Sequence, residues 1–409
     1  MSHVMNTYAR QPVAFVRGQG VWLWDDAGKK YLDALAGIAV NTLGHNHPRL
    51  TRALTEQIGR LIHCSNLFQN PLQEQAADRI AAITGLDEVF FCNSGLEANE
   101  AAIKVARKYG HDRGIAEPAI IVMEKAFHGR SLATLSATAS RKVQAAFEPL
   151  VQGFVRVPLN DLDAVRQVAA HNKNVVAVFV EPIQGEGGIN VSRMEYLKGL
   201  KEICDRHEWL FMSDEIQCGL GRTGKWFVYQ HAGFLPDVVP MAKGLAGGPA
   251  VGACVVGGRA KGVFKPGNHG STFGGNPLAM CGVVTTIDTM REEGLLENAA
   301  KVGAAMKAGL TAALGGLPGV VEIRGMGLML GIELERPCGE LVKQGLDAGL
   351  VFNVTADNVV RLLPPLVISE AEGREVVERL VPLVKAFLAQ GNAQPTKANS
   401  PHPISAAAR

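Results

Sequence analysis

WLFMSDEIQ, residues 209–217, and VVPMAKGLAGG, residues 238–248, are the two stretches that decide the predicted fold. Each begins as a short apolar run typical of a buried strand. The first run is followed by Asp214 and Glu215, and the second by Lys243 in a glycine-rich turn. In open α/β sheets, ligands bind at the carboxyl ends of the strands. The sequence therefore predicts an α/β fold in which a carboxylate and a lysine share a binding site.

Further apolar runs of strand type lie on both sides of this pair. They occupy residues 88–92, 119–123 and 175–180, and an antiparallel strand is expected over residues 251–258. Helical stretches such as residues 194–207 separate the runs. Strands that alternate with helices indicate a doubly wound sheet with helices on both faces.

The two ends of the chain have a different organisation. An N-terminal arm leads into a hairpin that turns at residues 26–28, and a helix is expected over residues 48–62. After residue 290, a helix over residues 295–314 precedes a pair of strands within residues 320–334. The closing helix begins with the capping box that starts at Ser369.

Composition excludes several classes of protein. The 409 residues carry a formal net charge of only +2, and no apolar run approaches the length of a membrane span. We therefore expect neither nucleic acid nor a membrane as a partner. The N-terminus lacks the pattern of a secretory signal, and the seven cysteines form no CxxC pair. Both features predict reduced thiols and a cytoplasmic location. His45 and His47 lack a third ligand, so no metal site is predicted.

Two segments could bind an anion such as phosphate. Asn93, Ser94 and Gly95 stand between a strand and a helix start, where free backbone N–H groups and the helix dipole attract anions. The alternative is an ordinary helix cap. Ser271 and Thr272 lie in a glycine-rich loop before another helix. That loop could equally be a simple turn.

Other side chains after the strands could contact a flat cofactor or a substrate. Phe127 could stack on a ring and Arg130 could meet a carboxylate, or they could be a core ring and a surface charge. Glu186 follows a buried strand together with Glu181. Arg361 stands in an apolar strand and needs a partner, either a structural acid or a substrate carboxylate.

We interpret the pair of strand ends as a site for pyridoxal phosphate. Lys243 would form an imine with the cofactor, and Asp214 would hold the protonated pyridine nitrogen. A nucleotide-binding oxidoreductase is disfavoured because Gly325-x-Gly327-x-x-x-Gly331 has the wrong spacing for a dinucleotide fingerprint. A non-catalytic cofactor-binding protein stays as an alternative, although the reactive residues are all present.

Five motifs and one lysine together resemble those of a known family. NSGLEANEAAIKVAR, FHGR, EPIQGEGG, DEIQCGLGRTG with a lysine downstream, and GSTFGGNP are similar in order and spacing to the class III pyridoxal phosphate aminotransferases. The resemblance covers about residues 8–390, and RLLPPL adds to its likeness to the branch that acts on acetylornithine. It implies fold type I, like aspartate aminotransferase, with a large domain around a mixed, mostly parallel seven-stranded sheet. It also implies a small α+β domain from both chain ends.

The resemblance implies a division of the chain and a homodimer with shared active sites. We expect residues 1–60 to form an arm and part of the small domain, and residues 61–290 the large cofactor-binding domain. Residues 291–391 would complete the small domain. Residues 392–409 are polar and rich in small residues and proline, which predicts a disordered tail.

The same resemblance implies cofactor roles for particular residues. Residues 94–96 match a phosphate cup, although Leu96 stands where many relatives have threonine. Phe127 and Ile216 match residues that cover the two ring faces, and Gln217 matches a hydrogen-bond donor to the phenolic oxygen. The matching catalytic residues are Lys243 and Asp214. The expected cofactor-binding residues are Ser94, Gly95, Leu96, Phe127, Asp214, Glu215, Ile216, Gln217, Lys243 and Thr272, the last donated by the partner subunit.

For the substrate, the resemblance implies transfer of the terminal amine of acetylornithine to 2-oxoglutarate. Arg130 and Ser271 match residues near the acylated donor. Arg361 matches an arginine that binds an α-carboxylate, and Glu186 matches a glutamate that pairs with it and moves aside. Ornithine, succinylornithine and 4-aminobutyrate stay open as alternative amino donors.

Overall fold

The computed structural model describes residues 3–392 of the chain. The predicted disordered tail lies outside the described residues except for Asn392, which is the last residue of a helix. Within residues 3–392, no helix combines the length and the hydropathy that crossing a membrane requires.

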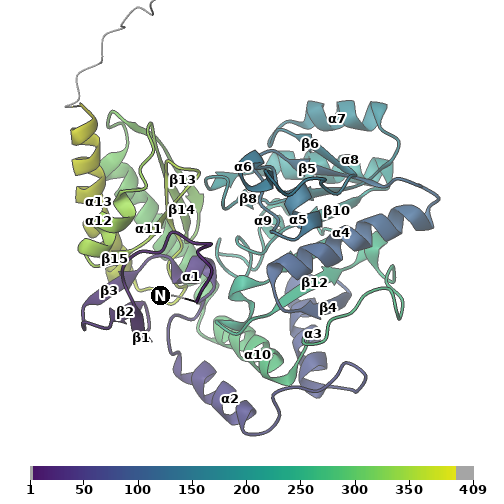
Figure 1. Cartoon of the computed structure of the whole chain (residues 1–409), viewed down its shortest axis with the longest axis horizontal. Coiled ribbons are helices and arrows are strands. Elements are labelled where there is room, and N and C mark those ends of the chain that lie inside the picture. The colour runs from purple at the N-terminus through teal and green to yellow at the C-terminus, as the bar shows by residue number, and fades with distance from the viewer. Residues whose placement is uncertain (1–2, 393–409) are drawn as a thin grey trace, which may run out of the picture.

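A mixed sheet of seven strands forms the centre of one part of the molecule (Figure 1). Its strand order is β4-β12-β11-β10-β7-β5-β6. Only β12 runs antiparallel to its neighbours, so the predicted α/β fold and the mostly parallel sheet are confirmed. The strands are β4 (Glu88–Cys92), β5 (Ala119–Met123), β6 (Phe154–Val157), β7 (Val175–Val180), β10 (Leu210–Ser213), β11 (Val238–Met241) and β12 (Gly252–Val256).

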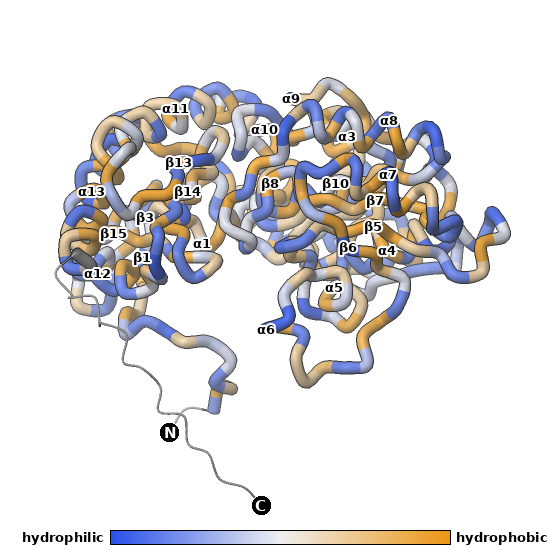
Figure 2. The backbone as a smooth tube through the Cα atoms, turned by 90° about the horizontal axis from the view of Figure 1, so that it is seen from above, coloured by the Kyte–Doolittle hydropathy of each residue, from blue (hydrophilic) through white to orange (hydrophobic). Residues whose placement is uncertain are grey.

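The inner strands read as continuous apolar runs because both faces of the sheet are covered. Every residue of β5, β7, β10 and β11 is buried, and Figure 2 shows hydrophobic colouring along β5, β7 and β10. Helix α4 (Gly95–Asp112) packs on one face. Helices α7 (Leu162–His171) and α8 (Met194–His207) pack on the other. This arrangement is the doubly wound sheet that the sequence predicted.

The second part of the molecule combines the two ends of the chain. The N-terminal hairpin strands β2 and β3 pair with β1 on one side and with β15 on the other, so that Leu32 lies opposite Leu350. A second four-stranded sheet has the order β13-β14-β17-β16. The strands are β1 (Phe15–Gln19), β2 (Trp22–Asp25), β3 (Lys30–Asp33), β13 (Val320–Met326), β14 (Met329–Leu334), β15 (Leu350–Val351), β16 (Asn353–Thr355) and β17 (Val359–Leu362).

The helices outside the central layers follow from local signals. The capping box is confirmed: the Ser369 N–H donates to Glu372 Oε2 at 2.9 Å, and the Glu372 N–H donates to Ser369 Oγ at 3.2 Å. The remaining helices are α1 (Ala36–Ala39), α2 (Pro48–Ile58), α3 (Pro71–Thr84), α5 (Leu132–Ala137), α6 (Arg141–Gln144), α9 (Tyr229–Ala232), α10 (Pro277–Glu292), α11 (Leu295–Leu314), α12 (Leu341–Asp347) and α13 (Glu370–Asn392). Two short 3-10 helices are η1 (Lys243–Ala246) and η2 (Gly258–Ala260). Strands β8 (Ile183–Gln184) and β9 (Asn190–Val191) form a separate two-stranded sheet.

One predicted boundary is wrong by about a turn. The helix expected over residues 48–62 is α2, which ends at Ile58. Gly59 follows it, and glycine is a poor helix former. The chain then turns through residues 59–70 before α3.

The core beneath the first functional strand gives a stability prediction. Phe211 in β10 is fully buried and meets Phe234 edge to face, with ring centroids 4.9 Å apart. Phe211→Ala should destabilise the protein by roughly 3–5 kcal/mol through cavity formation and lower Tm by several degrees. Calorimetry checks this. The control is Leu235→Ala, since Leu235 is exposed; equal losses for both variants would contradict the packing.

Candidate active site

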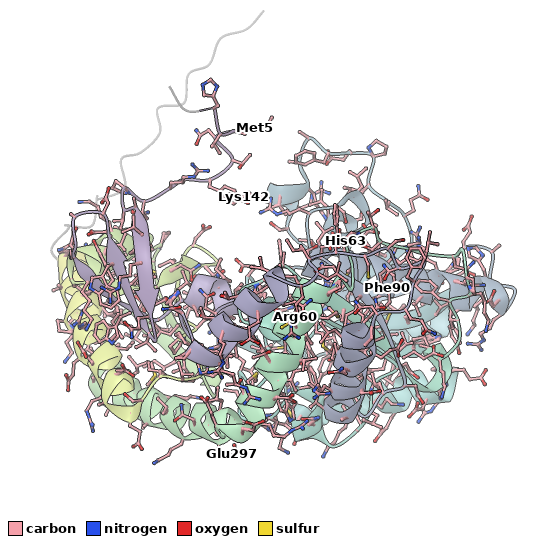
Figure 3. The ribbon with its side chains drawn as sticks, turned by 90° about the horizontal axis from the view of Figure 1, so that it is seen from below. Met5, Arg60, His63, Phe90, Lys142 and Glu297 are labelled. Carbon is pink, nitrogen blue, oxygen red and sulfur yellow. The ribbon has the colours of Figure 1, made fainter. Side chains whose placement is uncertain are left out.

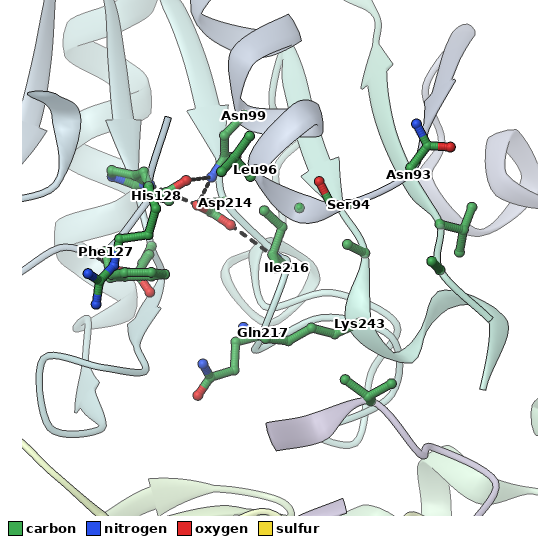
Figure 4. Close-up of a pocket in the computed structure, with 18 of the residues that line it drawn as sticks. Asn93, Ser94, Leu96, Asn99, Phe127, His128, Asp214, Ile216, Gln217 and Lys243 are labelled. Atoms are coloured by element: carbon green, nitrogen blue, oxygen red, sulfur yellow. Dashed lines mark hydrogen bonds and ion pairs between the residues drawn. The ribbon is translucent and has the colours of Figure 1, made fainter. Parts of the chain in front are cut away.

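A cavity of about 370 Å³ opens at the carboxyl ends of the central strands. It lies where β10 and β11 end and α4 begins, so the two predicted strand ends do converge. Figure 4 shows Asp214, Asn99 and His128 on one side of Ile216, with Lys243 and Gln217 on the other. The predicted residues in the wall are Ser94, Gly95, Leu96, Phe127, Arg130, Asp214, Ile216, Gln217 and Lys243.

Asp214 is fixed by three hydrogen bonds. Its Oδ2 lies 2.7 Å from His128 Nδ1 and accepts from Asn99 Nδ2 at 2.8 Å. Its Oδ1 accepts the Ile216 N–H at 3.1 Å. The side chain is buried, so these donors replace the water that would otherwise solvate the carboxylate. Oδ1 keeps room for one more donor on the cavity side.

The sequence predicts no role for two of these partners, His128 and Asn99. His128 stacks on Phe179 with ring centroids 4.1 Å apart and an interplanar angle of 15°. Because its Nδ1 faces a carboxylate oxygen, Nδ1 carries the proton. Asn99 also donates to the His128 backbone oxygen at 2.7 Å. The available signal for Asn99 was a polar side chain among the alanines on the buried face of a predicted helix.

Lys243 follows β11 and begins the turn η1. Its φ of 38° lies in the left-handed region that non-glycine residues rarely adopt. Within residues 3–392, its Nζ makes no hydrogen bond. Burial lowers the pKa of Lys243, while the charges of Glu186 and Asp214 act in the opposite direction. A lowered pKa favours the neutral amine, which is the nucleophilic form.

The start of α4 forms part of the cavity wall. Ser94 is the N-cap, and its Oγ accepts the Glu97 N–H at 3.2 Å. The N–H groups of Gly95 and Leu96 come first in the helix and have no acceptor inside it. A Cβ on Gly95 would lie 2.9 Å from the Ile216 side chain, so only glycine lets the helix end approach this residue. The predicted cap is confirmed, and the residues of this helix start line the cavity.

A second, larger cavity adjoins the first and shares Phe127, Arg130 and Lys243 with it. Glu186 lines this larger cavity and pairs with the buried Arg361. Arg361 Nη1 donates to Glu186 Oε1 at 2.5 Å and to Gln217 Oε1 at 3.1 Å. Burial of Glu186 would raise its carboxyl pKa, but the charge of Arg361 and its hydrogen bond outweigh burial and lower that pKa.

Arg361 is completely buried, whereas 38% of the Glu186 side chain is exposed. The Arg361 Nε donates to Asn353 Oδ1 at 3.0 Å. Its Nη2 has no partner within the described part of the chain, although a buried guanidinium nitrogen ordinarily has one. The pair thus joins a partly exposed acid to a buried arginine that keeps one guanidinium nitrogen without a partner in the described residues.

Glu181 joins the two loops that flank the cavities. Its Oε1 accepts the Phe127 N–H at 2.7 Å, and its Oε2 accepts the Gly185 N–H at 3.2 Å. Burial raises the pKa of Glu181 to about 7. The Arg130 guanidinium lies 5.8 Å from the Phe127 ring centroid, so the two predicted contact residues stand side by side.

Besides Glu186 and Arg361, three predicted site residues lie outside the smaller cavity. Glu215 points into the core, where its carboxylate accepts the N–H groups of Val228 at 2.9 Å and Tyr229 at 3.3 Å. Ser271 Oγ accepts from Asn93 Nδ2 at 3.2 Å, which places this loop beside the start of α4. Thr272 is exposed on the same loop.

The mixed seven-stranded sheet, joined to a smaller part built from both chain ends, is the architecture of fold type I of the pyridoxal phosphate-dependent enzymes. Within that class, the chain belongs to the class III aminotransferases, whose family profile matches residues 4–384.

Curated relatives support the same family over nearly the whole chain. The acetylornithine aminotransferase of Nitrosomonas europaea is 56% identical over 388 residues, which cover 95% of this chain and 99% of the relative. Acetylornithine aminotransferase 1 of Bordetella bronchiseptica is 53% identical over 389 residues, with the same shares.

Solved structures confirm the fold. The ornithine aminotransferase of Toxoplasma gondii superposes with a TM-score of 0.91 at 34% identity and covers 95% of this chain and 94% of its own. The acetylornithine aminotransferase of Elizabethkingia anophelis gives a TM-score of 0.85 at 36% identity and covers 94% and 97%.

The position of Glu215 yields a pH prediction. Burial raises its pKa to about 7, whereas an unfolded chain has a value near 4.3. Between these values the folded protein holds a proton that the unfolded chain has released, so this group makes the protein less stable as pH rises from 5 to 8. Glu215→Gln removes that loss. The free energy of unfolding of the variant, relative to the wild type, should therefore rise by roughly 2 kcal/mol from pH 5 to pH 8, and its Tm should rise relative to the wild type accordingly.

The measurement is thermal unfolding of both proteins between pH 5 and pH 8. Glu202→Gln is the matched control because Glu202 is exposed on α8. A Tm difference for Glu215→Gln that stays constant with pH would show that Glu215 is not the buried titrating group.

Proposed function

We propose that this protein uses pyridoxal phosphate to transfer the terminal amino group of N2-acetyl-L-ornithine to 2-oxoglutarate. The products would be N-acetyl-L-glutamate 5-semialdehyde and L-glutamate. The observation that carries the proposal is the buried Asp214 carboxylate and the unpaired Lys243 amine facing one cavity beside an arginine with a spare donor. The names of relatives at 44–56% identity support the choice of substrate.

The residues present fit the cofactor. The free N–H groups of Gly95 and Leu96 suit a phosphate, and Ile216 and Phe127 suit the two faces of a flat ring. Asp214 has acceptor capacity left for a ring N–H. When bound, pyridoxal phosphate takes up the amino group and draws the negative charge of the substrate carbon into its ring.

Lys243 holds and moves the proton in this proposal. Burial lowers its pKa, so its Nζ can accept a proton from the substrate carbon and return it. Asp214 stays fixed by Asn99 and His128 and favours a positive charge on the group that it faces. The rigid network means that no side chain near Asp214 has to reorganise when charge develops.

Arg361 and Arg130 would divide the recognition of two substrates. Arg361 Nη2 can donate to a carboxylate once Glu186 has swung away. While Glu186 stays in place, Arg361 is neutralised and a donor that presents its terminal amine is not repelled. Arg130 lines both cavities and would contact the acylated end of that donor.

We further propose a cytoplasmic homodimer in which Thr272 and Ser271 face the partner's site. Leu67, Phe68 and Phe273 are 87%, 69% and 61% exposed, an apolar surface of the kind that subunit contacts cover. All seven cysteines are free, which suits a reducing compartment.

Steady-state assays test the proposed reaction. Acetylornithine, ornithine, succinylornithine and 4-aminobutyrate are each paired with 2-oxoglutarate, and kcat/KM is compared. Acetylornithine should give the highest value, and Lys243→Ala should abolish turnover with every donor. A preference for ornithine or 4-aminobutyrate would overturn the substrate assignment, and turnover by Lys243→Ala would overturn the site.

The Arg361–Glu186 pair predicts how the two half-reactions differ. In Glu186→Gln, Arg361 no longer has to leave an ion pair to bind the α-carboxylate of 2-oxoglutarate. The ratio of the oxo-acid to the acetylornithine half-reaction rate constants should rise about tenfold in single-turnover experiments. Glu375→Gln is the control, because Glu375 pairs with Arg379 on α13 and neither residue lines either cavity. An unchanged ratio would contradict the movable cover.

A further inference from the structure

A short left-handed turn lies next to the active site. The φ angles of Ala36, Gly37, Ile38 and Ala39 in α1 are 51°, 64°, 66° and 62°. Left-handed residues normally occur singly, and only glycine adopts this conformation without a steric penalty. Three of these four residues are not glycine, so the surrounding structure must hold the turn in place.

Asp33 provides the anchor. Its Oδ1 accepts the N–H groups of Leu35 and Ala36, each at 2.8 Å, and so fixes the entry into the turn. Its Oδ2 lies 2.7 Å from His45 Nε2. Asp33 is 1% exposed, and a buried carboxylate with these partners is costly to displace.

Contacts with the N-terminal segment hold His45 in place. Its backbone forms a bridge with Gly20, with N–H···O distances of 2.7 and 2.8 Å. A Cβ on Gly18 would lie 2.6 Å from the His45 Cβ, so the strand β1 lies directly against this side chain. The Asp33–His45 pair therefore ties the turn to the N-terminal sheet.

The other side of the turn faces the site. Gly37 and Ile38 line the larger cavity together with Lys243, and Val40 lines the smaller one. Just after the turn, Thr42 Oγ1 donates to the Gly244 oxygen at 3.2 Å.

Contact between the turn and the lysine segment is close. A Cβ on Gly244 would collide with the Thr42 hydroxyl, so glycine after Lys243 is required for the fit. The wall of the cavity and the strained backbone of Lys243 thus support each other.

We propose that Asp33, supported by His45, is a positioning residue that enforces the left-handed turn and so sets the substrate-side wall beside Lys243. The inference deepens the proposed function, since the substrate that meets this wall is the one named there. Asp33 touches neither cavity and acts through backbone conformation.

The test compares holoenzyme variants by kcat, KM for the amino donor, cofactor absorbance and Tm. Asp33→Ala should reduce kcat/KM at least tenfold, mainly through KM, while the absorbance of the bound cofactor stays. Asp33→Asn keeps an Oδ1 acceptor for both N–H groups and should recover most of that loss. His45→Ala, at a less buried position, should raise KM about threefold.

A rescue variant separates the turn from general stability. Ala39→Gly in the Asp33→Ala background removes one steric penalty and should recover kcat/KM about threefold. The control is Asp25→Ala, because Asp25 makes similar hydrogen bonds outside both cavities. It accepts the Lys29 N–H at 2.8 Å and the Tyr31 hydroxyl at 2.7 Å. It should lower Tm without changing KM.

Unchanged KM in both Asp33→Ala and His45→Ala would overturn the proposal, as would equal effects of Asp33→Ala and Asp25→Ala on KM. A crystal structure of Asp33→Ala with the turn intact would also contradict it. If the wild type prefers another amino donor, the proposed substrate fails. The positioning role is then judged with that donor, so the two failures are distinguishable.

Discussion

The fixed carboxylate of Asp214 is the constraint on which the site depends. It stands at the end of a strand with no exposed residue, and its N–H donates to the Val180 oxygen at 2.8 Å. Hydrogen bonds from Asn99 and His128 hold one oxygen, and the Ile216 N–H holds the other. Because α4 provides Asn99 and also begins at the cavity wall, one helix sets the distance between this carboxylate and the N–H groups at the helix start.

Around this fixed point, the reactive segments are strained and mutually supported. Lys243 and the α1 turn both use the left-handed region, and they meet through Thr42 and Gly244. Such conformations persist only where neighbouring contacts determine them. Glu186 differs from both segments, because its side chain is partly exposed while it pairs with a buried arginine. Under the proposed function, rigid support on one side and a displaceable acid on the other would suit a cavity that alternates between two substrates.

Much of this arrangement could be predicted from the sequence, for identifiable reasons. The buried strands are continuous apolar runs, so the sheet and both strand-end residues could be found from local pattern. His128 and Asn99 could not, because their role depends on which strand end they meet in space. Glu215 shows the reverse: it adjoins Asp214 in sequence, but successive residues point to opposite sides, and its carboxylate lies in the core. Four left-handed residues in a row leave no sequence pattern, since three of them are not glycine.

The central claim is that Asp214 keeps the ring nitrogen of the cofactor protonated. The most direct measurement is the ¹⁵N chemical shift of holoenzyme reconstituted with pyridoxal phosphate labelled at the ring nitrogen. The account predicts the shift of a protonated pyridine in the wild type at neutral pH, and a move toward the unprotonated value in Asp214→Asn. An unprotonated shift in the wild type would contradict the role assigned to this carboxylate.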